Sequence, residues 1–307
     1  MRIVIWGAGG IGCYYGSKLQ LAGHEITYVA RGDHLEAMQL KGLVVEHERL
    51  SFSGAVSAVD QTELLNNYNC DDFDLIVLTV KANATQEIIS QSRHWLSRGQ
   101  TPVLSLQNGV ENEQLIAEAV GNSRTLGGLA VRIGGHIQEP GVVTAKGIAQ
   151  IVLGCWPSVA ETNNTKYFTE KLVDTFNRAG IPTTHSEDIQ KELWRKLLIN
   201  NGVNPLSALT ELDTKSITHD SVYKHVVYKM MEETALAARN HGVDITERDV
   251  DEMFNLISEF DAIKTSMLVD KEKGRPLELD GICGPVLRNT DNGQALLTAL
   301  ISNLLKH

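Results

Sequence analysis

Glycines near the N-terminus have the spacing of a phosphate-binding turn. The sequence reads G-x-G-x-x-G over residues 7–12, directly after an apolar strand expected within residues 1–6. In a dinucleotide site the first glycine permits a tight turn, the second lets the backbone approach a pyrophosphate, and the third lets the next helix pack on the strand. A helix expected from about residue 11 to residue 22 would direct its free N–H groups and its positive dipole end at the phosphates. The cofactor-binding residues expected here are Gly7, Ala8, Gly9, Gly10, Ile11 and Gly12.

The next strand indicates which nucleotide is bound. Glycine clusters also form ordinary turns, but here a second strand over residues 24–30 follows at the spacing of a βαβ unit. NAD-binding folds usually end this strand with an acidic residue, whereas Arg31 stands there in this chain and matches a 2′-phosphate. The sequence therefore predicts NADP(H), with a solvated loop charge as the alternative for Arg31. Asp33 is expected as the N-cap of a short helix over residues 35–40.

Lys196, Asn200 and Asn204 stand four residues apart in a helical pattern. Each step of four advances about 40° around a helix and about 6 Å along it, so one lysine and two amides share a stripe. Leucines alternate with the stripe and predict a mostly buried helix, which Pro205 would bend. Interior asparagine is unfavourable in helices, and such costs are tolerated at functional sites. The alternative is that the lysine reaches solvent and the amides satisfy loop carbonyls.

Three further residues are candidates by position. Glu278 follows Pro276-Leu277 among apolar neighbours, where it could cap the first turn of a helix or act in a site. Asn108 follows the strand expected at residues 102–106, where a loop can reach a nicotinamide ring, although Asn-Gly is also a plain turn signal. Lys81 ends the strand at residues 74–80 in the same way.

Composition restricts the class of protein. At 307 residues the chain can form two domains with cores of their own. Its net charge of -10 argues against nucleic acid or an anionic membrane as a partner, since both are bound by clustered Lys and Arg. No room for a signal peptide precedes the first strand, and no apolar run reaches membrane-spanning length. The four scattered cysteines lack metal-ligand spacing, so we expect buried thiols, no metal site and a cytoplasmic location.

The pattern of expected elements divides the chain in two. The apolar runs at residues 74–80 and 102–106 are typical of parallel strands covered on both faces, with a helix over residues 83–96 between them. Strand-like pieces at 129–133, 141–144 and 150–153 indicate an antiparallel extension. After about residue 187 only helical spacing remains, at 190–209, 221–241, 247–260 and 294–305, the third capped by Thr246. We predict an α/β protein, with a Rossmann-type doubly wound domain over residues 1–187 and an all-α domain over residues 188–307.

Taken together, these motifs resemble the ketopantoate reductase (2-dehydropantoate 2-reductase) family over essentially the whole chain. The specific part is the E-L-W-R-K-L-x-x-N stretch from Glu192 to Asn200, with Asn204-Pro-Leu206 and Ser266-Met-Leu268 after it and E-x-D at Glu278–Asp280. Thr79-Val-Lys81-Ala82, Gln107-Asn-Gly109 and Pro140-Gly-Val-Val143 add to it. The resemblance implies a two-domain, NADPH-dependent oxidoreductase that makes pantoate for pantothenate and coenzyme A synthesis.

The resemblance also implies roles for individual residues. Lys196 matches the family's general acid and Glu278 its substrate-binding, catalytic carboxylate. Asn200, Asn204 and Ser266 match substrate positions, Asn108 matches the cofactor and active-site asparagine, and Arg31 and Lys81 match cofactor positions. The implied partner is a small 2-oxo acid, and the assembly considered is a homodimer.

The chain departs from the family pattern at three positions. Cys283 replaces a common asparagine, while Ile263 and Thr214 stand where some members place polar substrate contacts. A reductase of another small 2-oxo acid is therefore the nearest alternative. A non-catalytic NADP-binding sensor is a third hypothesis, although it would predict loss of Lys196 and Glu278, which both remain.

Overall fold

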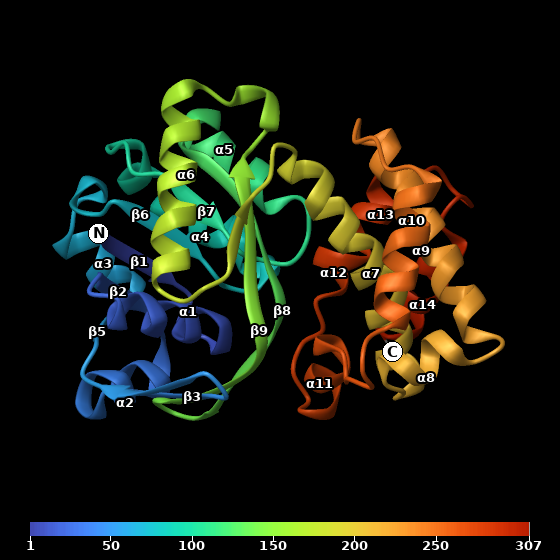
Figure 1. The fold of residues 1–307 in the computed structure, drawn as a ribbon, viewed down its shortest axis with the longest axis horizontal. Helices are drawn as coiled ribbons and strands as arrows, with labels where there is room; N and C mark the ends of the chain where they lie inside the picture. The colour runs from blue at the N-terminus through green and yellow to red at the C-terminus, as the bar shows by residue number, and fades with distance from the viewer. Residues whose placement is uncertain (307) are drawn as a thin grey trace. The chain divides into compact units, whose positions relative to one another are not determined.

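The fold is that of a computed structural model, in which residues 1–306 are described (Figure 1). It divides into two compact units. The first contains Met1–Gln107 and Asn112–Ile189, and the second contains Asn108–Glu111 and Gln190–His307. No helix within residues 1–306 is long and apolar enough to cross a membrane. The predicted assignment of residues 1–187 and 188–307 to a cofactor domain and a substrate domain stays a prediction.

The first unit is built on a ten-stranded sheet whose main part is parallel. This part contains β1 (Arg2–Trp6), β2 (Glu25–Val29), β5 (Ser57–Val59), β6 (Leu75–Leu78), β7 (Val103–Ser105) and the start of β8 (Thr125–Glu139). The strands lie in the order β5-β2-β1-β6-β7-β8, and every neighbouring pair is parallel. Numbered along these six, the order is 3-2-1-4-5-6, that of doubly wound dinucleotide-binding sheets. The predicted fold class is confirmed.

An antiparallel extension continues the sheet beyond β8. β9 (Val142–Cys155) pairs antiparallel with β8 along almost its whole length, and β10 (Thr183–His185) pairs parallel with β9. β3 (Leu43–His47) lies parallel to β9 and antiparallel to β4 (Leu50–Gly54). The extension was predicted, but as short pieces of which the first ended at residue 133, whereas β8 continues through Gly134-Gly135 to Glu139. The half-exposed strands β3, β4 and β5 were not predicted.

Alternate residues of β1 belong to two different cores. Ile3 and Ile5 pack with buried residues of α1 (Gly10–Leu21) and α6 (Asn163–Arg178). Val4 and Trp6 pack with buried residues of α3 (Gln61–Asn67), α4 (Thr85–Ser97) and α5 (Asn112–Val120). Because neighbouring side chains of a strand point to opposite faces, helices cover the parallel sheet on both sides. Figure 1 shows α6 crossing in front of the sheet.

The regular elements of the second unit are all helices in the part of the chain that the structure describes. Its longer helices are α7 (Ile189–Thr210), α9 (Tyr223–Asn240), α10 (Glu247–Ser258) and α14 (Leu296–Leu304), which match the four predicted segments. Thr246 accepts a hydrogen bond from the Asp249 N–H and caps α10 as expected. The shorter helices are α8 (Thr214–His219), α11 (Ser266–Glu272), α12 (Leu279–Ile282) and α13 (Gly284–Arg288). These are too short to give a helical periodicity in the sequence.

The packing of α1 on β1 predicts a stability difference between two glycines of the same turn. A Cβ at Gly12 would lie 2.3 Å from the Gly7 carbonyl oxygen, whereas a Cβ at Gly9 would meet nothing within 4 Å. Since backbone atoms cannot yield, Gly12→Ala should lower the free energy of unfolding by about 1–3 kcal/mol, the cost of overpacking. Gly9→Ala is the matched control and should change it by less than about 0.5 kcal/mol. Urea unfolding of both variants measures the difference, and equal losses would contradict it.

Candidate active site

The glycine-rich turn lies where the strand order reverses, at the carboxyl end of β1 between β2 and β6. Gly7 has a φ of +115°, a conformation that side chains disfavour, and its N–H donates to the Val29 carbonyl. On the other side, the Thr79 hydroxyl donates to the Gly7 carbonyl at 2.8 Å. A Cβ at Gly12 would also lie 2.6 Å from this hydroxyl oxygen. Thr79 therefore supports the turn from β6, a role that its place in the T-x-K-A motif did not reveal.

The turn fits a dinucleotide pyrophosphate. Space is open beside Gly9, so a ligand can approach its backbone closely. The N-cap residue of α1 is Gly9, which has no side chain to cap the helix. The first turn of α1 contains no acidic residue. The N-terminal N–H groups of α1 thus face no carboxylate of their own turn that would compete with a phosphate. That Gly7, Gly9 and Gly12 bind a cofactor stays a prediction.

Arg31 is exposed directly after β2 and occupies the N-cap position of α2 (Gly32–Lys41) without a side-chain cap hydrogen bond. Asp33 lies inside the first turn of α2, so the prediction that it caps this helix was wrong. The helix begins at Gly32, earlier than its apolar pattern suggested. Arg31 is thus a cation at the end of β2, where an adenosine 2′-phosphate is read in such folds.

His34 holds the start of α2 in place, and sequence analysis missed it. Its Nδ1 accepts a hydrogen bond from the Gly141 N–H at 3.0 Å, in the turn between β8 and β9. Its Nε2 lies 3.8 Å from the Cys13 Sγ of α1. Burial lowers the pKa of His34, so the ring stays neutral and its Nδ1 remains an acceptor near pH 7. One buried imidazole therefore connects α2, α1 and the β8–β9 turn beside Arg31.

Lys81 is exposed at the N-cap position of a short 3₁₀ turn after β6, as predicted from its place at the end of that strand. The neighbouring backbone is fixed by Gln107, whose side-chain amide donates to the Val80 carbonyl at 3.1 Å and to the Thr85 hydroxyl at 2.7 Å. Thr85 donates in turn to the Asn112 side chain at 2.8 Å. Gln107, Thr85 and Asn112 are buried. This polar network joins the ends of β6 and β7 to α4 and α5.

The lysine–amide stripe lies on α7 in the second unit. Lys196 and Asn200 are half-buried and Asn204 is buried, while the flanking Leu193 and Leu197 are fully enclosed. The prediction of a mostly buried helix is confirmed, and α7 continues through Pro205. The three polar side chains therefore follow one line along a helix that is otherwise largely buried.

Asn201, next to this stripe, anchors α7 from another side. Its side-chain amide donates to the Thr234 hydroxyl of α9 and to the Thr298 hydroxyl of α14, each at 3.0 Å. All three side chains are fully buried or nearly so. Because the partners lie 33 and 97 residues away, the spacing along α7 gave no sign of this contact.

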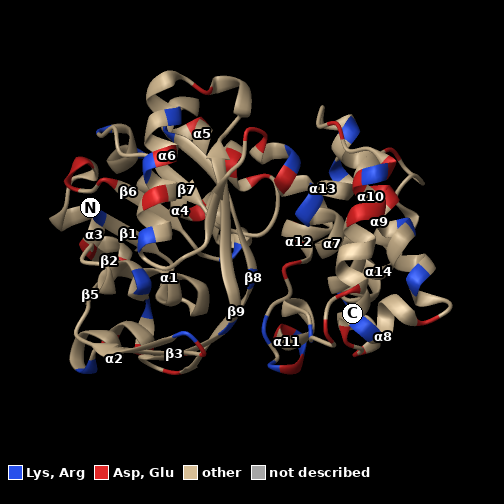
Figure 2. Ribbon diagram, viewed as in Figure 1, with Lys and Arg blue, Asp and Glu red and all other residues tan. Residues whose placement is uncertain are grey.

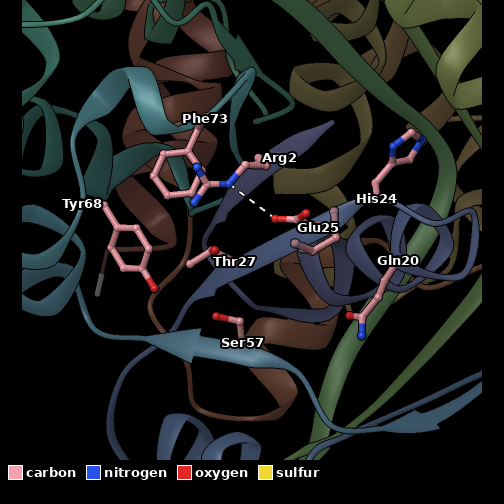
Figure 3. A pocket seen from close by; sticks show the side chains of 9 residues that line it. Arg2, Gln20, His24, Glu25, Thr27, Ser57, Tyr68 and Phe73 are labelled. Carbon is pink, nitrogen blue, oxygen red and sulfur yellow. Dashed lines mark ion pairs between the residues drawn. The ribbon is translucent and has the colours of Figure 1, made fainter.

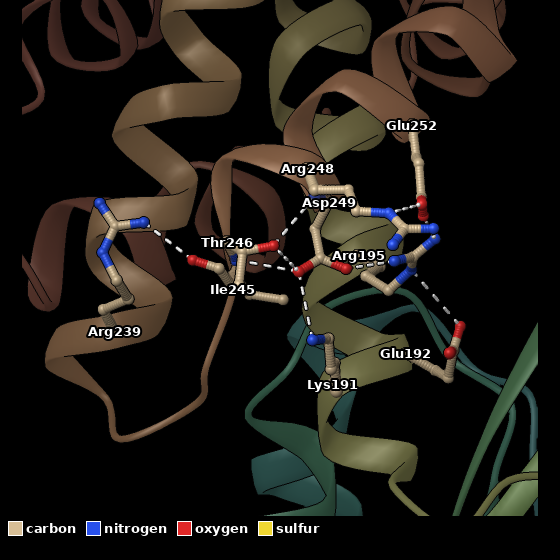
Figure 4. A network of polar contacts seen from close by, with 9 residues as sticks. All are labelled: Lys191, Glu192, Arg195, Arg239, Ile245, Thr246, Arg248, Asp249 and Glu252. Atoms are coloured by element: carbon tan, nitrogen blue, oxygen red, sulfur yellow. Dashed lines mark hydrogen bonds and ion pairs between the residues drawn. The ribbon is translucent and has the colours of Figure 1, made fainter.

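A charged network fixes the first turns of α7 against α10 (Figure 4). Arg195 binds Asp249 and also Glu252, the latter at 2.9 Å, and Lys191 lies 3.2 Å from Asp249. Burial opposes ionisation of Asp249, but hydrogen bonds from Thr246 and Lys191 hold its pKa at about 2. Acidic and basic residues accordingly lie close together on α10 (Figure 2). The residue directly before Lys196 is thus clamped to a second helix.

Ser266 and Glu278 begin two short helices of the second unit. Ser266 is exposed at the first position of α11, which the Thr265 hydroxyl caps by accepting from the Leu268 N–H. Glu278 is half-buried at the N-cap position of α12, yet its side chain makes no cap hydrogen bond to that helix. The capping interpretation of Glu278 therefore lacks the contact that defines a cap.

Two of the positions that depart from the family pattern contact each other. The Thr214 hydroxyl donates to the Asp261 carbonyl at 3.1 Å and accepts from the Ile263 N–H at 3.2 Å. Thr214 is buried, and Ile263 is 48% exposed. The third position, Cys283, is fully buried with its thiol near Ser302 of α14. Cys283 thus belongs to the helical core, as a buried thiol like the other three cysteines.

A cavity of about 460 Å³ opens elsewhere in the first unit (Figure 3). It is lined by residues at the amino ends of β1 and β2, including Arg2, Glu25 and Thr27, with Phe73 under the Arg2 guanidinium. Ligands of doubly wound sheets bind at the carboxyl ends of the strands, which is the opposite edge. Within residues 1–306 no group of three or more His, Cys, Asp or Glu side chains is placed to hold a metal ion.

Comparisons with known proteins agree with this architecture. A family model described as ketopantoate reductase PanE/ApbA matches residues 3–158, and the model of its C-terminal part matches residues 188–305. A 2-dehydropantoate 2-reductase of Pyrococcus horikoshii is 30% identical, covering 100% of this chain and 97% of the relative. A second protein of that name, from Mesorhizobium japonicum, is also 30% identical, over 93% and 90% of the two chains.

Solved structures share the fold over the whole chain. The crystal structure of 2-dehydropantoate 2-reductase from Geobacter metallireducens has a TM-score of 0.86 and 29% identity, covering 100% of this chain and 99% of that one. A ternary structure of D-mandelate dehydrogenase with NADH and anilino(oxo)acetate has a TM-score of 0.88 at 22% identity, covering 100% and 97%, and shows the fold alone. The resemblance inferred from the motifs is confirmed: the chain belongs to the ketopantoate reductase PanE/ApbA family.

Proposed function

We propose that this protein reduces 2-dehydropantoate (ketopantoate) to pantoate with NADPH, a step toward pantothenate and coenzyme A. The observation that carries the proposal is the stripe of Lys196, Asn200 and Asn204 on α7 in a member of this family. A chain that only sensed the cofactor would have no use for a lysine and two amides aligned on a largely buried helix, since burying polar groups is costly.

The proposed roles follow from the chemistry of each side chain. When bound, NADPH supplies a hydride to the carbonyl carbon of the 2-oxo acid. Lys196, as the general acid, donates a proton to the carbonyl oxygen, where negative charge develops. Asn200, Asn204 and Ser266 hold the substrate's carboxylate and hydroxyl by hydrogen bonds, and Asn108 contacts both cofactor and substrate.

Glu278 is proposed to bind the substrate hydroxyl and to assist Lys196. Its position at the start of α12 without a cap hydrogen bond supports this assignment over a capping role. A carboxylate held near an ammonium favours the charged, proton-donating form of that ammonium. The glycine turn, Arg31 and Lys81 are proposed to hold NADP(H) through its pyrophosphate and 2′-phosphate.

A reductase of a different small 2-oxo acid is the second candidate. The Thr214 hydroxyl is occupied by the backbone of residues 261 and 263, and Ile263 presents an apolar side chain near Ser266 in sequence. Both features favour a less polar substrate than one recognised by polar groups at these positions. The cytoplasmic location, the absence of a nucleic-acid partner and a homodimeric assembly stay predictions.

The substrate is tested by measuring NADPH oxidation against a panel of 2-oxo acids. Ketopantoate should give the highest kcat/KM, because recognition of a substrate hydroxyl by buried polar groups rejects analogues that lack it by large factors. The panel should include branched 2-oxo acids with and without a terminal hydroxyl. A higher kcat/KM for an acid without that hydroxyl would transfer the assignment to the second candidate.

The cofactor assignment predicts a selective effect of Arg31. Arg31→Ala should raise the KM for NADPH by about tenfold or more and leave the KM for NADH nearly unchanged, because only NADPH carries a 2′-phosphate that pairs with the guanidinium. Steady-state kinetics with both cofactors measure the effect. Lys41→Ala, which removes a cation from the other end of α2, is the matched control and should change neither value. Equal use of the two cofactors by the wild type would refute the assignment.

The acid assignment predicts that Lys196→Ala lowers kcat by about 10²–10⁴-fold, the usual effect of losing a positioned acid. Glu278→Gln should lower kcat/KM for the 2-oxo acid by about tenfold or more, a transition-state loss of about 1.4 kcal/mol. NADPH affinity, measured by fluorescence titration, should stay near wild type in both. If Lys196→Ala kept kcat and raised only KM, the lysine would bind substrate without acting as the acid. Unchanged kcat/KM in Glu278→Gln would return this residue to a structural role.

A further inference from the structure

Arg288, at the end of α13, binds carboxylates from two other segments of the second unit, one near in sequence and one distant. Its Nε and Nη2 lie 3.0 Å and 2.5 Å from the two carboxylate oxygens of Glu111, a bidentate pair across 177 residues of sequence. Its Nη1 lies 2.7 Å from the Asp280 carboxylate, and its Nη2 also donates to the Asp280 carbonyl at 3.2 Å. One planar guanidinium thus joins three segments.

The two bound segments carry proposed site residues. Glu111 ends the segment Asn108–Glu111, the part of the first half of the chain that belongs to the second unit. Asn108 is three residues before it. Asp280 is two residues after Glu278, within the first turn of α12. Holding Glu111 and Asp280 at one guanidinium therefore fixes the backbone next to Asn108 and next to Glu278.

Gly284 makes room for this arrangement. A Cβ at Gly284 would lie 2.5 Å from Nη2, 2.6 Å from Nη1 and 2.8 Å from Cζ of Arg288. The guanidinium therefore folds back over the glycine, one helical turn before it, to reach both carboxylates. A glycine in a helix costs about 1 kcal/mol relative to alanine. Here the Arg288 guanidinium fills the space that a Cβ at Gly284 would take.

The ion pairs of Arg288 with Glu111 and Asp280 are partly exposed, so they can position the two segments while adding little to folding stability. The side chains of Arg288, Glu111 and Asp280 are 46%, 35% and 81% exposed. Ion pairs at such exposure add little to folding stability. The Glu111 carboxylate, and then Asp280, raise the pKa of Arg288, so the guanidinium stays charged at every physiological pH. A bidentate fork nevertheless fixes direction as well as distance, which a lysine could not do.

We propose that Arg288 is a positioning residue for the reduction, which holds the Asn108 loop and the Glu278 turn in register with each other. The inference rests on the proposed function, because the roles of Asn108 and Glu278 come from it. Misplacement of reacting groups by about 1 Å costs up to about 10²-fold in rate even when its cause is remote from the chemistry.

The test compares Arg288→Ala and Gly284→Ala with the wild type. Gly284→Ala keeps the arginine but places a methyl group where the guanidinium lies, and alanine also favours the helix. Both variants should lower kcat for the 2-oxo acid by about 10–100-fold. Gly284→Ala should keep or raise the melting temperature. The dissociation constant of NADPH alone should change far less than kcat, by less than about threefold, because the proposed phosphate contacts of the glycine turn and Arg31 are kept and only the contact of Asn108 is disturbed. Arg288→Lys should recover part of the rate.

Arg178→Ala is the matched control, since it removes an exposed arginine paired with Asp174 on α6, and it should keep kcat. If Arg288→Ala and Gly284→Ala both kept kcat within about twofold of an active wild type, Arg288 would be a surface ion pair and the positioning role would be refuted. A wild type that reduced no acid of the panel would instead refute the proposed function, and the positioning role with it.

Discussion

The close approach of α1 to β1 is the constraint on which the first unit depends. Gly12 leaves the helix so near the strand that a single methyl group would overlap the Gly7 carbonyl, and the Thr79 hydroxyl completes the contact from β6. The same helix touches β8, because a Cβ at Gly10 would lie 2.0 Å from the Gly135 carbonyl carbon. Gly135 is therefore a glycine inside a strand because another backbone approaches it. These contacts fix the direction of α1, and with it the direction of the N–H groups offered to a phosphate.

Buried polar side chains hold the remaining site-bearing segments. Gln107 links the ends of β6 and β7. Asn201 fixes α7 to α9 and α14, and Arg195 fixes it to α10. None of these residues needs to touch a ligand. Each instead costs desolvation free energy that is recovered only when its partners are in place, so each favours one arrangement of the segment beside it. The positions of the proposed catalytic residues are thus fixed by buried polar residues that lie one or a few positions away in sequence.

Features set by local spacing could be predicted from the sequence, and features set by contacts between distant residues could not. Local patterns predicted β1, α1, β2, Arg31 at the end of β2, and the stripe on α7, because these depend on spacings shorter than one element. The roles of Thr79, His34 and Arg288 could not be predicted, because their partners lie 72, 107 and 177 residues away. The half-exposed strands β3 and β4 were missed for a related reason: their stability comes from pairing with each other and with β9. Asp33 was assigned as a cap because the apolar pattern shows where a helix is buried, not where it begins.

The departures from the family pattern fall into two physical classes, which bear differently on substrate choice. Cys283 is fully buried, and burial raises its pKa to about 12, so it stays a neutral thiol packed toward Ser302. A side chain enclosed in this way changes packing under α13 without offering a charge to a substrate. Thr214 and Ile263 form a local pair close in sequence to Ser266, and Ile263 keeps almost half of its surface exposed. Any change of substrate relative to ketopantoate is therefore expected from the loop of residues 261–265, while the lysine, amides and carboxylate proposed to perform the reduction are retained.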